Sequence, residues 1–231
     1  DLANRVMFQD RLRHDLERAR LVNKSVAVLC IDLDLFKNVN DSFGHHTGDK
    51  LLTLVAARLA ADARQDNLVA RLGGDEFAMI LRGDMSPNDV SARAVQIIET
   101  LSEPYEIDGL EAVIGASIGI AISPGDGDTG EELLRNADMA LYRAKSEGGS
   151  VHRFFEKEMD RHAQMRRDME IDLRRALATG EFQLHYQPLV DLEQDRIVAF
   201  EALLRWHHPV KGMVSPADFI PVAEDIGLIV P

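Results

Sequence analysis

The segment "SVAVLCIDL" at residues 25–33 restricts the fold more than any other, because it is a nearly continuous apolar run with several β-branched residues. A run of this kind is typical of a strand that is covered on both faces. Apolar residues at helical spacing precede it over 5–21, and residues 48–64 carry a second amphipathic helical pattern. The sequence therefore predicts a buried strand within a mixed fold of helices and strands.

The rest of the first 155 residues adds elements of both kinds. The segments "NLVARL" and "EFAMIL" flank "GGD", a pattern that predicts a β-hairpin with a glycine turn. The polar segment 34–50 is interpreted as a loop. Further elements are predicted as helices over 86–102 and 129–149, a strand over 110–124 and a short strand over 151–155. This mixture favours an α/β (α+β) sandwich built on a central sheet.

A long charged stretch separates this part from the rest of the chain. Residues 156–180 predict one helix with few apolar positions that ends in glycine, as in a linker or signalling helix. Two strands around a polar turn and the start of a helix follow it. About 50 residues rarely bury a self-sufficient core. We therefore expect a first domain at 1–155, a linker helix at 156–180 and the opening of a truncated second domain at 181–231.

Composition argues against two classes of function. The formal net charge of −13 disfavours a nucleic-acid groove, whose mark is a basic patch. No run approaches the roughly 20 apolar residues of a membrane span. The single Cys30 lies in the first apolar run, which favours a buried, inert thiol and a reducing compartment. With no signal-peptide core at the N-terminus, a cytoplasmic location is expected.

Acidic residues gather where the sheet is predicted to end. Asp32 closes the buried strand, and Asp34 shares its face because side chains alternate along a strand. If the hairpin strand lies beside this one, Asp75 approaches Asp32. Carboxylates without His or Cys suit Mg²⁺ or Mn²⁺, and Mg²⁺ keeps positions open for phosphate oxygens, which indicates a nucleoside triphosphate. The alternative is that "GGD" is an ordinary surface turn and "DLD" a solvated strand end.

The neighbouring polar residues fit a nucleotide. Backbone N–H groups of the Leu35–Lys37 turn could hold phosphates, and Lys37 could add a point charge. Asn40 and Asp49 are short polar side chains, and an amide with a carboxylate is a suitable pair for the edge of guanine.

These motifs together resemble a known family. "RLGGDEF", with "IDLDLFKNVNDSFGHHTGD" before it and "ADMALYRAKSEGG" after it, is similar to GGDEF diguanylate cyclases over residues 1–155. "LHYQPLVD", "FEALLRW" and "FIPVAEDIGLI" resemble the opening of an EAL domain, the cyclic di-GMP phosphodiesterase family. The resemblance implies a palm-like nucleotide-cyclase sandwich with a mostly antiparallel central sheet, then the linker helix and the truncated start of a TIM-like barrel.

The GGDEF resemblance implies condensation of two GTP into cyclic di-GMP, with one GTP bound by each domain of a homodimer. Asp75 would be the base for the attacking hydroxyl, and Glu76 would support the metal site. The implied ligands of Mg²⁺ (or Mn²⁺) are Asp32, the carbonyl of Leu33, Asp75 and Glu76. The implied GTP contacts are Leu35, Phe36, Lys37, Asn40, Asp49, Gly73, Gly74 and Lys145, the two glycines leaving room for the nucleotide.

Three departures from the family pattern change what is expected. The inhibitory Arg-x-x-Asp pair reads "RQDN", so Arg64 is kept but Asn67 replaces the acid, and product inhibition there is not expected. Gly149 stands where an arginine is usual, which removes one phosphate contact. The opening motif survives only as "DLANR".

In the EAL part the resemblance assigns Glu201 to a metal-ligand position, and Gln187 and Arg205 to substrate contacts, with Glu224 matching a further acid. The remaining ligands would lie beyond Pro231, so this chain alone is not expected to hydrolyse cyclic di-GMP. The pair His207–His208 is interpreted as structural.

Three functions stay open at this point. The first is an active diguanylate cyclase. The second is a GTP-binding regulatory domain that controls an attached phosphodiesterase. The third is a scaffold whose long helix dimerises or binds a partner.

Overall fold

The structure is a computed structural model that describes residues 2–63, 67–83 and 85–229. The chain divides into two compact units, residues 1–160 and 161–231. The division into domains at 155 and 180 stays a prediction.

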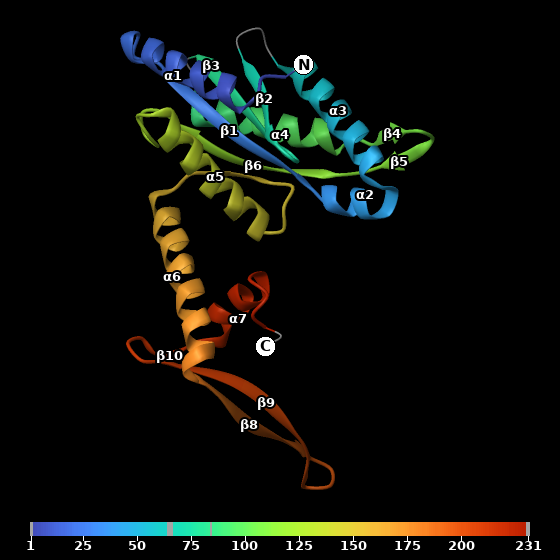
Figure 1. The fold of residues 1–231 in the computed structure, drawn as a ribbon, viewed down its shortest axis with the longest axis vertical. Coiled ribbons are helices and arrows are strands. Elements are labelled where there is room, and N and C mark those ends of the chain that lie inside the picture. The colour runs from blue at the N-terminus through green and yellow to red at the C-terminus, as the bar shows by residue number, and fades with distance from the viewer. Residues whose placement is uncertain (1, 64–66, 84, 230–231) are drawn as a thin grey trace. The chain divides into compact units, whose positions relative to one another are not determined.

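The first unit is built on a five-stranded sheet in the order β2-β3-β1-β6-β7 (Figure 1). The central strand β1 (Ser25–Asp34) pairs antiparallel with β3 (Glu76–Gly83) and with β6 (Gly115–Ile122). β2 (Leu68–Gly73) is antiparallel to β3, whereas β7 (His152–Phe154) is parallel to β6. The prediction of a mostly antiparallel central sheet in a mixed α/β fold is confirmed.

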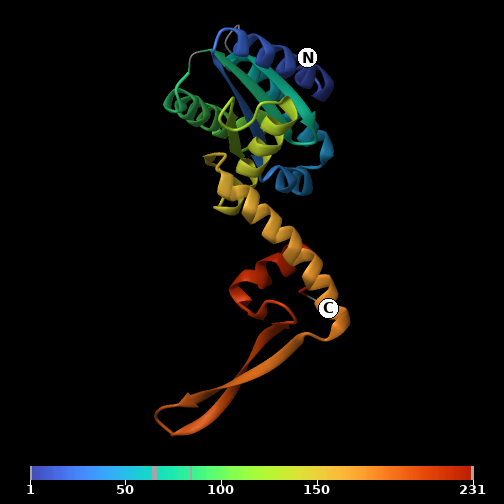
Figure 2. The same cartoon turned by 90° about the vertical axis from the view of Figure 1, so that its left-hand side faces the viewer.

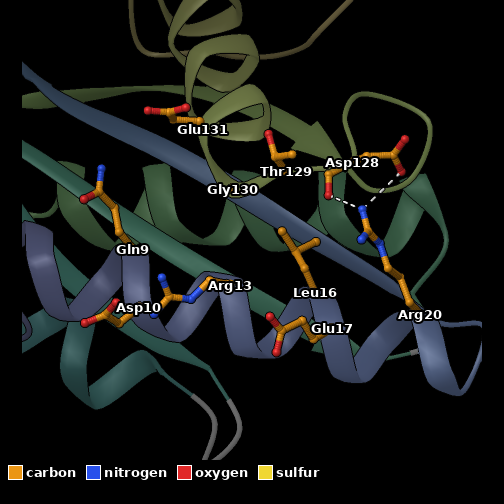
Figure 3. A pocket seen from close by; sticks show the side chains of 10 residues that line it. All are labelled: Gln9, Asp10, Arg13, Leu16, Glu17, Arg20, Asp128, Thr129, Gly130 and Glu131. Carbon is orange, nitrogen blue, oxygen red and sulfur yellow. Dashed lines mark hydrogen bonds and ion pairs between the residues drawn. The ribbon is translucent and has the colours of Figure 1, made fainter.

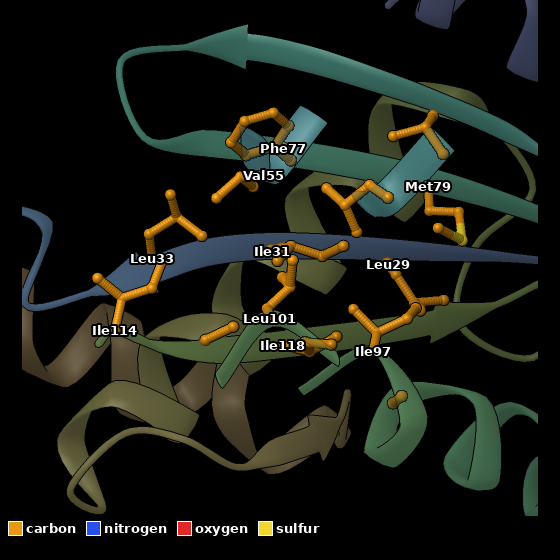
Figure 4. Packing of buried hydrophobic residues seen from close by; sticks show 14 of the residues in the cluster. Leu29, Ile31, Leu33, Val55, Phe77, Met79, Ile97, Leu101, Ile114 and Ile118 are labelled. Atoms are coloured by element: carbon orange, nitrogen blue, oxygen red, sulfur yellow. The ribbon is translucent and has the colours of Figure 1, made fainter. Parts of the chain in front are cut away.

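Both faces of the sheet are covered by helices, as the continuous apolar run of β1 predicts (Figures 1 and 2). On one face Leu29, Ile31 and Leu33 pack with residues of α3 (His45–Asp62) and α4 (Pro87–Ser102), as Figure 4 shows in part. On the other face Val28 and Cys30 pack against α1 (Arg5–Leu21) and α5 (Gly130–Ser146). Because side chains alternate along the strand, Asp32 and Asp34 lie on the α1/α5 face.

Local signals fix the helix and hairpin boundaries. Ser86 and Asp89 form a capping box at the start of α4, and Thr129 and Glu132 form one at the start of α5. The predicted β2–β3 hairpin is present, with its turn after Gly73. The predicted short strand at 151–155 is also present, as β7.

Two predictions of local structure are wrong. The expected loop at 34–50 contains the helix α2 (Phe36–Phe43), and α3 begins at His45. Only Val39 of α2 is buried, and Phe36, Val39 and Phe43 recur at helical spacing, but the helix has only eight residues and is rich in Asn and Asp, which favour turns. The expected strand at 110–124 is divided into β5 (Leu110–Ala112) and β6.

β5 pairs with a strand that was not predicted, β4 (Tyr105–Ile107). Asp108 and Gly109 between them both have positive φ, at 53° and 81°. Asp-Gly is a strong signal for such a two-residue hairpin turn, and it was readable in the sequence.

The second unit contains most of the long helix α6 (Lys157–Thr179), close to the helix expected at 156–180. The two expected strands are β8 (Phe182–Asp191) and β9 (Arg196–His208), and β10 (Gly212–Val214) joins them in an antiparallel sheet ordered β10-β9-β8. The helix α7 (Pro216–Asp225) follows. Within the described residues these strands form an open sheet and no closed barrel.

A small core holds the second unit together around Trp206, which is fully buried. The Trp206 ring contacts Phe182 and Phe219 at centroid distances of 5.5 Å each, and Leu173 of α6 belongs to the same cluster. In contrast, apolar side chains of the β8–β9 hairpin are exposed, such as Leu184 and Phe200. Across the described parts of both units, no helix has the length and hydropathy needed to cross a bilayer.

Candidate functional site

The site is centred on Asp32, at the carboxyl end of β1 and on the face covered by α1 and α5. The strand register places Asp32 opposite Glu76 of β3 on one side and opposite Ser117 of β6 on the other. The side chain of Asp32 is only 10% exposed. Burial raises the pKa of the Asp32 carboxyl, and the nearby negative charges of Asp75 and Asp34 act in the same direction. A buried carboxylate among other acids is costly unless it takes up a proton or a cation pairs with it.

In this structure that cation is Lys145, from the last turn of α5. The Lys145 Nζ lies 2.6 Å from Oδ1 of Asp32, and this contact lowers the pKa of Asp32 against the effect of burial. The predicted phosphate-binding lysine and the predicted metal ligand are therefore brought into direct contact, although 113 residues separate them in the sequence.

The hairpin turn places Asp75 close enough to act on the charge of Asp32. Gly73 and Gly74 both have positive φ, at 154° and 54°, and no atom lies within 4 Å of the position that a Cβ would occupy at either residue. Arg71 fixes the turn by donating from Nε and NH2 to the carbonyl oxygen of Gly74, at 2.9 and 2.7 Å. The structure leaves open space beside both glycines, and its use by a ligand stays a prediction.

Glu76 is paired with a cation of α1. The Glu76 carboxylate lies 3.6 Å from Arg5 at the start of α1, and both side chains are about half exposed. Within the described residues no group of three His, Cys, Asp or Glu side chains stands at metal-binding spacing. The oxygen donors of Asp32, Asp75 and the Leu33 carbonyl nevertheless fit a hard divalent cation in kind, and the buried charge of Asp32 favours one.

The predicted nucleotide contacts lie on α2 and at the start of α3. Leu35 precedes α2 with a φ of 64° and no side chain caps the helix, so the backbone N–H groups of Phe36 and Lys37 begin an uncapped first turn. Asn40 packs directly against Gly48, where a Cβ would lie 2.0 Å from Oδ1 of Asn40. Because Asp49 follows Gly48 in the same helix, the α2–α3 corner brings together the two residues predicted to bind guanine.

A network around Asp34 was not predicted. Its carboxylate accepts hydrogen bonds from Oγ of Ser117 (2.8 and 3.0 Å), from the backbone N–H of Ser150 (2.7 Å) and from Oγ of Ser150 (3.2 Å). Gly149 also lies against it, since a Cβ there would be 3.0 Å from Oδ2 of Asp34. The alternation of Asp32 and Asp34 was the only sequence signal, because the partners are distant in the chain.

The degenerate inhibitory pair is only partly visible. Asn67 lies immediately before β2, whereas Arg64 is outside the described residues. The expected loss of product inhibition stays a prediction.

In the second unit the predicted EAL residues lie on the hairpin. Gln187 of β8 stands opposite Glu201 of β9, and Arg205 follows on the same face of β9. Glu201 and Gln187 are exposed, as is Glu224 in α7. The structure thus places Gln187 and Glu201 opposite each other, and neither residue is buried.

His208 has a structural role, whereas His207 takes no part in it. The buried His208 ring accepts two backbone hydrogen bonds at Nδ1, from Val210 (3.0 Å) and Lys211 (2.9 Å). Its Nε2 lies 3.1 Å from Asp172 of α6. These bonds fix the turn after β9 to the linker helix.

A hollow of about 460 Å³ lies elsewhere on the first unit, between α1 and the start of α5 (Figure 3). Arg20 of α1 bonds Asp128 across one end of it. None of its lining residues is a predicted site residue, and Lys145 is at the opposite end of α5.

Comparison with known proteins defines the family that the fold and the acidic site indicate. Residues 1–150 match the family described as "Diguanylate cyclase, GGDEF domain", and residues 170–231 match the family described as "EAL domain". The chain belongs to the GGDEF family, and its GGDEF domain is followed by part of an EAL domain.

Similar proteins carry both activities in their names. The chain is 45% identical over 229 residues to the bifunctional diguanylate cyclase/cyclic di-GMP phosphodiesterase MucR of Pseudomonas aeruginosa, covering 99% of this chain and 33% of MucR. It is 40% identical over 230 residues to the cyclic di-GMP phosphodiesterase NbdA of the same organism, covering 99% of this chain and 29% of NbdA. The chain thus spans about a third or less of these relatives.

Among solved structures, the GGDEF domain of TpbB (YfiN) from Pseudomonas aeruginosa matches with a TM-score of 0.69 and 40% identity. The match covers 71% of this chain and 95% of that one. The first unit therefore has the GGDEF fold.

Proposed function

We propose that the GGDEF domain of this chain synthesises cyclic di-GMP from two GTP, with release of pyrophosphate, within a GGDEF–EAL signalling protein. The observation that supports this most directly is the buried Asp32 carboxylate, with Lys145 in contact and Asp75 nearby. A buried acid held by an exchangeable cation at the end of a central strand is suited to a metal nucleotide.

The residues take the following parts in this proposal. The guanine edge is read by Asn40 and Asp49, and the phosphates meet the N–H groups at the start of α2. Lys37 and Lys145 supply positive charge to the phosphate oxygens. Lys145 must leave Asp32 to do so.

Asp32, Asp75 and the Leu33 carbonyl would hold Mg²⁺ or Mn²⁺, with Glu76 turning from Arg5 to support the site. When bound, the metal neutralises charge that develops on the phosphate oxygens. Asp75 accepts the proton of the attacking 3′-hydroxyl. The new bond joins that oxygen to the α-phosphorus of the second GTP, and the bond to the leaving pyrophosphate breaks.

The reaction requires two nucleotides that face each other, and each domain offers one set of contacts. We therefore propose a homodimer as the active species, in the cytoplasm, where GTP is available. Cyclic di-GMP is the product, and it would also be the ligand of the EAL part through Gln187 and Arg205, with Glu201 at a metal-ligand position.

A second function is favoured by a specific observation. Gly149 lacks the cationic side chain that is usual in the family, and Lys145, one of the two cations proposed for the phosphates, is bound to Asp32. A domain with weakened phosphate contacts could bind GTP without turning it over and control an attached phosphodiesterase. The name of the relative NbdA, a cyclic di-GMP phosphodiesterase, agrees with this alternative.

One experiment separates the two. The purified chain is incubated with GTP and Mg²⁺, pyrophosphate and cyclic di-GMP are measured, and GTP affinity is determined in parallel. Synthesis that is lost in Asp75→Ala and kept in Asp10→Ala, an exposed acid of α1, supports the cyclase. Binding without product supports the regulatory domain. Synthesis by Asp75→Ala at the wild-type rate would show that the assignment of Asp75 is wrong.

A further inference from the structure

The loop that follows α5 is tied to the end of β1 by Asp34. Ser150 donates to Oδ2 of Asp34 from its backbone N–H at 2.7 Å and from Oγ at 3.2 Å. Ser117 of β6, which is completely buried, donates to both carboxylate oxygens and also accepts from the N–H of Ser150 at 3.1 Å. Hydrogen bonds to a charged acceptor are among the stronger ones in proteins. The carboxylate therefore holds this loop at a fixed place.

The same loop is also bonded to the end of α5. The N–H of Gly148 donates to the carbonyl of Lys145 at 3.1 Å, and the N–H of Gly149 donates to the carbonyl of Ala144 at 3.2 Å. Gly149 has a φ of 76°, a conformation that favours glycine, and its backbone lies against the Asp34 carboxylate. The four residues 146–149 thus connect Lys145 to Ser150, which bonds Asp34. This segment is hydrogen-bonded to the end of α5 on one side and leads to the bond with Asp34 on the other.

Two links therefore join the carboxyl end of β1 to the carboxyl end of α5 in the described structure. One is the side-chain contact of Lys145 with Asp32, and the other is the contact of Asp34 with Ser150. The first link must open when Lys145 turns to a phosphate group. The second link can stay closed throughout, because neither Asp34 nor Ser150 is needed to contact the nucleotide.

We propose that Asp34 is a positioning residue for GTP binding. It keeps the end of α5 beside β1 after Lys145 releases Asp32, so that the ammonium group remains within reach of the phosphates. This role rests on the proposed function, since it presupposes that Lys145 binds the phosphates of GTP. It also gives Gly149 a place in this arrangement, because its backbone lies against the Asp34 carboxylate.

The competing explanation is that Asp34 only stabilises the fold. The two roles differ in their dependence on Lys145. A residue that acts through Lys145 loses its effect on affinity once the ammonium group is removed, whereas a loss of folded protein lowers apparent affinity equally with or without it.

The test is a double-mutant cycle on the full chain. Affinity for an α,β-methylene analogue of GTP, which cannot lose pyrophosphate, is measured by calorimetry with Mg²⁺ for wild type, Asp34→Ala, Lys145→Met and the double variant. Supporting residues of this kind typically change affinity by about 10- to 100-fold, so we expect Asp34→Ala to weaken binding about 10-fold. In the Lys145→Met background we expect less than about a 2-fold further loss. An equal loss in both backgrounds would overturn the proposal.

Ser146→Ala is the matched control, because among the described residues the Ser146 hydroxyl bonds only the carbonyl of Arg143 in the same turn of α5. It is expected to bind the analogue as wild type does. If Asp34→Ala does not fold, Asp34→Asn replaces it, since the amide oxygen still accepts from Ser150 while the charge is removed. The same dependence on Lys145 is then required.

The outcomes also separate this proposal from the function on which it rests. A wild-type chain that binds no GTP analogue refutes both. A wild-type chain that binds it, together with an additive cycle, refutes the role of Asp34 alone and leaves the cyclase proposal intact.

Discussion

Gly119 in β6 is the position where a single methyl group should disturb the first unit most. A Cβ at this residue would lie 2.0 Å from the carbonyl oxygen of Ala137 and 2.1 Å from the backbone nitrogen of Leu141, both in α5. Ordinary contacts begin near 3.4 Å, so Gly119→Ala requires α5 to retreat by about 1.4 Å. The obstacle is helix backbone, which cannot move aside as a flexible side chain can.

The cost follows from the packing that this retreat loosens. Leu133, Ala137 and Leu141 of α5 belong to the buried cluster on this face of the sheet. Overpacking of a dense core costs roughly 1–3 kcal/mol, and the rigid obstacle places Gly119→Ala near about 3 kcal/mol. For a unit of 160 residues each kcal/mol lowers the melting temperature by about 2–4 °C. The expected decrease is therefore about 6–12 °C.

Scanning calorimetry of the full chain measures this decrease in the transition of the first unit. Gly125→Ala is the matched control, because the nearest atom to its Cβ position is 3.7 Å away and its φ is not positive. The control should melt within about 2 °C of wild type. If Gly119→Ala also melts within that interval, the close contact of β6 with α5 is not present as described.

Two further predictions concern charge. Lys145→Met should bind Mn²⁺ without nucleotide about 5-fold more tightly, as measured by electron paramagnetic resonance, because a partly buried ion pair of about 1 kcal/mol no longer competes for Asp32. Lys50→Met, which removes an exposed ion pair, should leave Mn²⁺ affinity unchanged, and an unchanged Lys145→Met would contradict the competition. Burial raises the pKa of the Cys30 thiol to about 12, so almost no thiolate exists at pH 8. A disulfide reagent should therefore react with Cys30 only after unfolding, and rapid reaction with the native chain would refute its burial.

The sheet was predictable because its signals are local. The continuous apolar run of β1 indicates that both faces of this strand are covered. The paired apolar runs around "GGD" predict the β2–β3 hairpin. The elements that were missed are short, although the Asp-Gly turn beside β4 is itself a strong signal. α2 buries one side chain, and β4 has three residues that depend on an Asp-Gly turn and on pairing with β5. In elements this short, tertiary contact counts for as much as the local pattern.

The site was predictable in its residues and less so in its contacts. Asp32 and Asp75 could be expected to approach each other from the adjacency of two strands alone. The contact of Lys145 with Asp32 depends on how α5 crosses the sheet, which no local pattern specifies. Asp34 was seen only as a neighbour of Asp32 on one face. Its partners Ser117 and Ser150 lie 83 and 116 residues away, beyond the reach of any spacing argument.

The structure changes the meaning of Gly149. In the sequence, Gly149 stands where the family usually has an arginine, and the expected consequence is weaker binding of phosphate. In the structure it is a residue with positive φ, and a Cβ added to it would lie 3.0 Å from Oδ2 of Asp34. A side chain at this position would strain the backbone and press on the group that holds the loop. The absence of the arginine and the tight conformation of the loop therefore go together. The positive charge that remains for the phosphates is carried by Lys145 and Lys37. On our proposal, the affinity of the domain for GTP then depends on how firmly Asp34 holds the end of α5.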